Sequence, residues 1–323
     1  MTSGSCWIRY PPLPHHCPNS FPTWMSTDMK ARSVPHIFLM GKGGVGKSTV
    51  TALLSLALQS IYKRIYIISL DPAHNQADIW QSPLSQKPKK VASGVWVVQM
   101  DMEQWTDHYL KQTRQHIKAQ YNYLTAFNLD KHLNVMQYAP GLHEYALMLA
   151  FEHASKTFGD ADLFLFDMPP TALTMRFFNL PQLSVLWLDK LMQLRQQILQ
   201  KKEVISRIQW GKKEWENDKI MNALREQKNT YQSIDGLLHD TNTSKIMLVV
   251  NPDLLSVSES VDIKNKLVQL NLSIKGVLLN KTTSTQDTAF IQDKLSDKIL
   301  IHFPIAANAP IGINNLNLLA NNF

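Results

Sequence analysis

The stretch Gly41-Lys42-Gly43-Gly44-Val45-Gly46-Lys47-Ser48-Thr49 fits G-x-x-x-x-G-K-[ST], the pattern of a phosphate-binding loop. An apolar run, 36–40, precedes it and a helical run, 49–60, follows it, which is the strand–loop–helix context that this motif requires. Glycines let the backbone N–H groups point into such a loop, and the helix dipole adds positive potential. We therefore expect a polyphosphate ligand, with Lys47 at its β- and γ-phosphates and the Ser48 hydroxyl at a Mg²⁺ position.

A second lysine, Lys42, follows the first glycine, where an ordinary phosphate-binding loop does not need one. The form Lys-Gly-Gly-Val-Gly-Lys-Ser resembles the deviant Walker A loop of an ATPase class that includes arsenite-pump, tail-anchored-protein-targeting, chromosome-partitioning, septum-positioning and nitrogenase-iron-protein ATPases. In that class the additional lysine reaches across a dimer interface and stabilises transition-state charge on the partner's nucleotide. The resemblance implies a homodimer that binds ATP and Mg²⁺, with the whole loop from Gly41 to Thr49 around the nucleotide. A solvated loop lysine is the alternative.

Composition sets broad limits on the fold and on the partners. The 323 residues, 44% of them apolar, suffice for one large α/β domain or two smaller ones, and no apolar run is long enough for a transmembrane span. The net charge of +7 permits an anionic partner but names none. Cys6 and Cys17 are the only cysteines, so neither a disulfide framework nor a Cys-x-x-Cys site can form. Proline-rich residues 1–33 lack a secretory signal, and we expect them to be disordered.

A second predicted strand, 64–70, delivers Asp71 at its carboxyl end, where parallel α/β sheets bind ligands. The following residues read Asp71-Pro72-Ala73-His74-Asn75-Gln76-Ala77-Asp78 and resemble switch I of the arsenite-pump and tail-anchored-protein-targeting ATPases, Asp-Pro-Ala-His-Asn/Ser-Leu-Ser-Asp. Gln76 and Ala77 replace the usual Leu and Ser. The resemblance makes Asp71 the catalytic carboxylate that positions or deprotonates the attacking water. Taken alone, Asp-Pro after a strand is an ordinary turn.

A later apolar run, 163–167, ends in Asp167 and has the Walker B pattern, in which the carboxylate holds the Mg²⁺ shell directly or through water. Residues 168–181 resemble the same family's switch II, with Pro170, Thr171, Thr174, Arg176, Leu180 and Pro181 in place. Met168, Pro169, Ala172 and Leu173 depart from Thr, Ala, Gly and His. Loss of a glycine stiffens a backbone that should move, so slow or differently coupled hydrolysis stays open.

Further along the chain, four residues are candidates for nucleotide contacts by their resemblance to the family. Asp253 lies in a segment, 252–259, that resembles one whose first acid contacts nucleotide across the dimer, and Glu259 is a second candidate there. Asn280, after the predicted strand 274–279, matches an asparagine that hydrogen-bonds adenine, a task that suits an amide. Pro304 follows the predicted strand 299–303, and this place resembles the start of the family's loop that covers the base. Asp101, after the strand 95–100, is expected to be structural.

The segment 182–238 is predicted to be helical, with an apolar stripe at Trp187, Leu191, Leu194 and Ile198. Residues 190–230 contain ten Lys or Arg against five Asp or Glu. In the targeting branch, helices at this place form a hydrophobic groove for a client's transmembrane helix, and Trp210, Trp215, Met221 and Leu224 are the candidate liners here. The alternative is that these apolar residues pack within the protein, and that the basic face approaches a membrane or is solvated.

Together these patterns predict an α/β fold: a doubly wound, mostly parallel P-loop domain over 34–323, with a helical subdomain at 182–240. By resemblance the chain is a cytoplasmic, Mg²⁺-dependent, homodimeric ATPase that binds a hydrophobic client segment, with peripheral membrane association open. The alternative is a nucleotide-dependent switch for a membrane or protein partner without such a client. Arsenite transport is disfavoured because the ATPase body has no thiolate ligands, and DNA partitioning is the weakest option.

Overall fold

The structure is a computed structural model that describes residues 34–120, 137–139, 141–209, 218–283, 286–295, 299–306 and 309–320. The segment 1–33, which we expected to be disordered, lies outside these residues. Trp210 and Trp215, two of the candidate groove liners, also lie outside them.

The strands form a single eight-stranded sheet in the order β3-β4-β2-β5-β1-β6-β7-β8. All neighbouring strands are parallel except β3, an edge strand that pairs antiparallel with β4. This confirms the predicted mostly parallel sheet; the prediction lacked only the short hairpin partner β3. The strands are β1 His36–Met40, β2 Ile65–Ser69, β3 Lys89–Ala92, β4 Val95–Gln99, β5 Leu163–Asp167, β6 Ser244–Val250, β7 Ile274–Thr282 and β8 Ile299–Pro304.

The central strand β1 shows why the sheet is covered on both faces. All of its side chains are buried, and the four apolar ones alternate between two hydrophobic clusters. Phe38 and Met40 join one cluster, whereas Ile37 and Leu39 join the other. A strand of a parallel sheet reads as a continuous apolar run because helices cover both of its faces.

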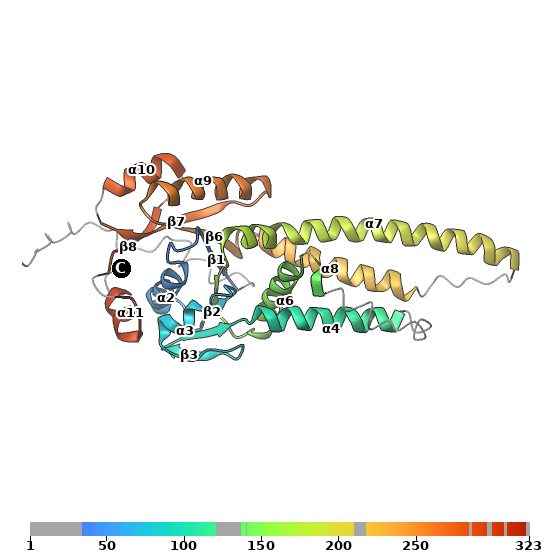
Figure 1. Cartoon of the computed structure of the whole chain (residues 1–323), viewed down its shortest axis with the longest axis horizontal. Helices are drawn as coiled ribbons and strands as arrows, with labels where there is room; N and C mark the ends of the chain where they lie inside the picture. The colour runs from blue at the N-terminus through green and yellow to red at the C-terminus, as the bar shows by residue number, and fades with distance from the viewer. Residues whose placement is uncertain are drawn as a thin grey trace, which may run out of the picture.

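The helices divide between these two faces and make the fold doubly wound (Figure 1). Residues of α2 Lys47–Ala57, α3 Asn75–Trp80 and α11 Ile313–Ala320 pack into the cluster with Ile37 and Leu39. The other cluster contains residues of the remaining helices. These are α4 Met102–Gln120, α6 Leu142–Thr157, α7 Thr171–Gln209, α8 Lys219–His239, α9 Leu254–Gln269 and α10 Gln286–Leu295.

Helices α7 and α8 extend side by side away from the sheet, with α4 running in the same direction (Figure 1). We call α7 and α8 the helical arm. Two ion pairs join them, Arg195 with Asp218 at 2.9 Å and Lys228 with Asp189 at 2.6 Å. The arm has no break at the predicted boundary of 182, because α7 begins at Thr171 and continues through Pro181. No helix in the described part of the chain is long and apolar enough to cross a membrane.

A buried histidine stands at the start of the central strand. The ring of His36 lies 5.0 Å from that of Phe164 and 5.5 Å from that of Phe166, centroid to centroid. Burial lowers the pKa of His36 to about 4, although its hydrogen bond to the Val34 carbonyl opposes the shift. The folded protein therefore holds this imidazole neutral at pH values where the unfolded chain protonates it.

We expect His36 to make folding pH-dependent. Between the unfolded pKa of 6.5 and the folded pKa of about 4, only the unfolded state binds the proton, so stability falls as the pH is lowered through this window. The loss between about pH 7.5 and pH 5 should be roughly 2 kcal/mol. Urea unfolding at both pH values checks this. The control variant His36→Phe keeps a ring among the phenylalanines, and an equal loss in that variant would contradict the assignment.

Candidate active site

The predicted site residues gather at the carboxyl ends of the parallel strands. The phosphate-binding loop connects β1 to α2, Asp71 follows β2, and Asp167 is the last residue of β5. Strand β5 lies between β1 and β2, and Asp167 is in register with Leu39 on one side and Ser69 on the other. The sheet order therefore places both carboxylates beside the loop, as the sequence predicted for a parallel α/β sheet.

Two glycines of the loop cannot be replaced without displacing a neighbour. A Cβ at Gly41 would lie 2.4 Å from the Val249 carbonyl oxygen. Gly46 has φ +89°, and a Cβ there would lie 2.4 Å from the amide nitrogen of Asn280. The loop thus packs closely against β6 and β7, and Gly46 has a backbone conformation that favours glycine.

The ammonium group of Lys47 is directed into the loop. This side chain is buried, and its Nζ donates to the Lys42 carbonyl oxygen at 3.3 Å. Burial lowers the pKa of Lys47, while the charges of Asp167, Asp71 and Glu259 oppose the change. The Lys47 ammonium can bind phosphate once its contact with the Lys42 carbonyl oxygen is exchanged.

Asp167 is fully buried, and burial raises its pKa to about 6. Gln76, the nearby Ser48 hydroxyl and Lys47 limit this rise. Its Oδ2 accepts a hydrogen bond from Gln76, but its Oδ1 has no hydrogen-bond partner among the described residues. An unsatisfied buried carboxylate oxygen beside a serine hydroxyl fits the hard oxygen ligands that Mg²⁺ prefers. Ser48 and Asp167 are therefore the residues that could hold the ion.

Asp71 is also buried at this edge, and its Oδ1 accepts a hydrogen bond from the Ala73 backbone N–H at 3.0 Å. This contact closes the turn after β2 and orients the carboxylate. The turn leads into α3, whose preceding residue His74 has φ +55°. Asp71 thus serves the local turn and still contributes negative charge at Lys47.

Lys42 contacts a residue of its own chain. Its Nζ lies 4.0 Å from Oε2 of Glu259, with about a third of each side chain exposed. Glu259 Oε1 also accepts from the Thr171 hydroxyl at 3.1 Å, and that hydroxyl lies 3.4 Å from the Gly41 carbonyl oxygen. The loop, the start of α7 and α9 therefore meet at Glu259. That Lys42 crosses a dimer interface stays a prediction.

The three residues expected near the base differ in burial and in the contacts that they make. The Asn280 amide is buried and donates to the Val45 carbonyl oxygen at 2.7 Å, so it holds the phosphate-binding loop. Asp253 is exposed and caps α9 by accepting from the Ser256 N–H. Pro304 ends β8 at the same edge of the sheet. The nucleotide contacts of all three stay predictions. Asp101, which was expected to be structural, caps α4 by accepting hydrogen bonds from the backbone N–H groups of Glu103 and Gln104.

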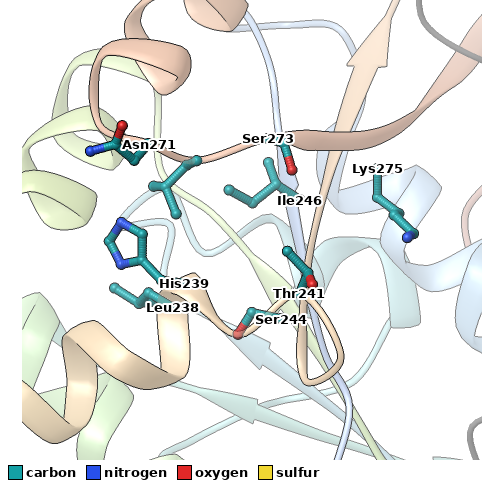
Figure 2. Close-up of a pocket in the computed structure, with 9 residues that line it drawn as sticks. Leu238, His239, Thr241, Ser244, Ile246, Asn271, Ser273 and Lys275 are labelled. Carbon is teal, nitrogen blue, oxygen red and sulfur yellow. The ribbon is translucent and has the colours of Figure 1, made fainter.

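A small pocket of about 50 Å³ opens at the opposite edge of the sheet, near the amino ends of β6 and β7 (Figure 2). His239, Ser244 and Ser273 are among its lining residues. It is too small for a nucleotide, and it lies away from the phosphate-binding loop.

Comparison with known proteins identifies the family. The family model described as "Anion-transporting ATPase" matches residues 34–320. The chain belongs to this family. It is 26% identical over 314 residues to "ATPase ASNA1 homolog 1" of Paramecium tetraurelia, covering 89% of this chain and 92% of that protein. It is 25% identical to "ATPase GET3A" of Arabidopsis thaliana, covering 77% and 67%.

A third relative is the "Putative arsenical pump-driving ATPase 1" of Aquifex aeolicus, 22% identical, with 76% of this chain and 62% of that protein covered. Membership of the family, together with the complete phosphate-binding loop, establishes the chain as an ATPase. The predicted family and activity are thereby confirmed.

Replacement of Asn280 by alanine should weaken phosphate binding, because the loop loses its hydrogen bond at Val45. We expect about three- to ten-fold weaker binding both of ATP and of inorganic tripolyphosphate, measured by calorimetry. The exposed residue Asn222 on α8 supplies the control variant Asn222→Ala. If Asn280→Ala weakened ATP but left tripolyphosphate unchanged, Asn280 would act at the base and not on the loop.

Proposed function

We propose that the protein is a Mg²⁺-dependent, homodimeric cytoplasmic ATPase whose nucleotide state moves the helical arm. The main support for this proposal is the cluster of Lys47, Ser48, Asp71 and Asp167 at one edge of the sheet. The phosphate-binding loop also contacts the helical arm, because Thr171, the first residue of α7, donates a hydrogen bond to the Gly41 carbonyl oxygen.

In this proposal the loop N–H groups and Lys47 bind the polyphosphate, and Asp71 orients the attacking water. Bound Mg²⁺ supplies charge neutralisation at the phosphates, held by Ser48 and Asp167. Lys42 must leave Glu259 to reach the partner's nucleotide. The weak contact in the single chain, 4.0 Å long and partly exposed, allows this exchange at small cost.

The start of α7 links this chemistry to the arm. Thr171 bridges the Gly41 carbonyl oxygen and Glu259, and the helix then continues for 39 residues, roughly 60 Å at the usual rise. Ala172 and Leu173, which replace the Gly and His of the family's switch II, lie in its first turn. Both are good helix formers, so a shift at Thr171 is transmitted along a continuous helix.

Replacement of Lys42 by alanine should lower the turnover number for ATP roughly a hundred-fold, because a charge at the transition state is lost. Asp71→Asn should have an effect of similar size, with ADP binding retained. Steady-state turnover and light scattering with and without ATP check both variants. Lys63→Ala, at an exposed lysine outside the site, is the control. Unchanged turnover and unchanged dimerisation in Lys42→Ala would refute the cross-dimer role.

The arm carries an exposed apolar stripe, and we propose that it binds a hydrophobic helical segment of a client. The stripe lies on α7 at helical spacing and consists of Leu183, Leu186, Trp187, Leu194 and Ile198, which are 39–62% exposed. It includes three of the four residues predicted from periodicity, whereas Leu191 packs against the core. Exposed apolar stripes of this extent mark interaction surfaces.

Two of the predicted groove liners are not part of this stripe. Met221 is buried, and Leu224 packs against the hydrophobic core, because the same side of α8 that carries them faces α7 and the domain. We therefore place the proposed client surface on the exposed stripe of α7. The second candidate function, a switch for a partner without a hydrophobic client, would use this stripe as a protein docking face.

Replacing both Leu186 and Trp187 by serine should reduce photo-cross-linking to an apolar helical peptide of about 20 residues at least five-fold. ATP turnover should stay within two-fold, since neither side chain reaches the phosphate-binding loop. The exposed polar neighbour Gln197→Ser is the matched control. Absence of peptide binding by the unmodified protein in the ATP, ADP and nucleotide-free states would favour the second candidate function.

A further inference from the structure

Gln76 is buried without any exposure in the first turns of α3, a position where the family's switch I carries leucine. Its Nε2 donates to Asp167 Oδ2 at 2.8 Å and to the Ser48 carbonyl oxygen at 3.1 Å. Its Oε1 accepts from the Trp80 indole N–H at 3.0 Å. One amide thus contacts the Walker B strand, the helix that follows the phosphate-binding loop, and its own helix.

The three contacts fix the orientation of the amide. The indole of Trp80 can only donate, so the Gln76 oxygen must face it. The carboxylate and the backbone carbonyl can only accept, so the amide nitrogen must face them. Rotation of the amide by 180° would place like groups against each other at all three contacts, and no such alternative is stable in a buried site.

We propose that Gln76 is a positioning residue for the metal-binding carboxylate, and that it couples Asp167 to switch I. By occupying Oδ2, the amide fixes the carboxylate plane and leaves Oδ1 as the oxygen directed to the metal shell. A hydrogen-bonded partner that orients a ligand in this way commonly changes metal affinity ten- to hundred-fold when removed. The inference rests on the proposed Mg²⁺ site of Ser48 and Asp167.

The same contacts make α3 respond to the state of Asp167. The helix begins four residues after Asp71 and ends at Trp80, which is buried in the cluster that α2 and α11 share. At the far end the Ile79 carbonyl oxygen accepts from the Gly312 backbone N–H at 2.8 Å. A movement of the carboxylate therefore reaches a short helix that is held at both ends, and the Trp80 indole reports on it.

The test is Mg²⁺ titration of the full-length protein in the presence of a fluorescent ADP analogue, which measures binding without turnover. In Gln76→Leu the Mg²⁺ concentration that half-saturates the nucleotide signal should rise about ten-fold or more, while metal-free binding of the analogue stays within two-fold. Gln112→Leu, the same change at an exposed position of α4, should match the unmodified protein. A shift below two-fold in Gln76→Leu overturns the proposal.

A second variant and an NMR signal distinguish loss of the positioning contact from misfolding of Gln76→Leu. Trp80→Phe keeps an aromatic ring but removes the indole donor to Gln76 together with some buried ring volume, and it should raise the Mg²⁺ requirement by about three-fold. In ¹⁵N-labelled protein, the indole N–H signal that Trp80→Phe deletes should shift when Mg²⁺ is added to the ADP complex. The signal should not shift in Gln76→Leu, and an equal shift there would overturn the coupling to α3.

Failure of the proposed metal site is a separate outcome. If the unmodified protein binds the analogue equally with and without Mg²⁺, the Mg²⁺ site of Ser48 and Asp167 is wrong, and Gln76 loses its proposed role with it. If the unmodified protein depends on Mg²⁺ and Gln76→Leu behaves identically, the metal site stands and only the positioning role is wrong.

Discussion

A carboxylate at the centre of a parallel sheet is the constraint around which this site is built. Asp167 is fully removed from water, and an ionised carboxylate in such a position requires nearby donors and cations. Lys47, Ser48 and Gln76 supply them from the phosphate-binding loop, α2 and α3. Packing of those elements against β5 is therefore coupled to the charge of one residue, and any ligand that changes this charge acts on all of them.

The second feature with consequences for function is the continuity of α7. Its first residue touches the phosphate-binding loop, and its exposed apolar stripe lies roughly three to eight turns further along. Backbone hydrogen bonds join successive turns of α7, although Pro181 has no N–H to donate and interrupts this ladder between Thr171 and the stripe. Under the proposed function, a small shift near phosphate would reposition a distant surface because the site and the stripe lie on one helix.

The sequence predicted the fold class and most of the site because both depend on local patterns. Apolar runs ending in Asp71 and Asp167, together with a glycine-rich loop before a helix, indicate strand ends at one edge of a parallel sheet. The edge strand β3 was missed because its four residues, Lys-Lys-Val-Ala, are exposed or only partly buried and have no clear apolar period. The turn that joins β3 to β4 contains Gly94, and its φ of +68° is known only from the structure.

What the sequence determined by itself was the family, the ATPase activity and the identity of the phosphate-binding, catalytic and Walker B candidates, because these reside in motifs of contiguous residues. The tertiary structure decided the partners of those residues. In the sequence Gln76 was only a departure from the switch I motif, whereas in the fold it hydrogen-bonds Asp167, which lies 91 residues away in the chain. The fold also shows that Asn280 holds the phosphate-binding loop by its hydrogen bond to Val45. Met221 and Leu224 turned inward while the α7 stripe stayed exposed. Such pairings depend on which faces pack together, and a helical period in one segment carries no information about the element that covers it.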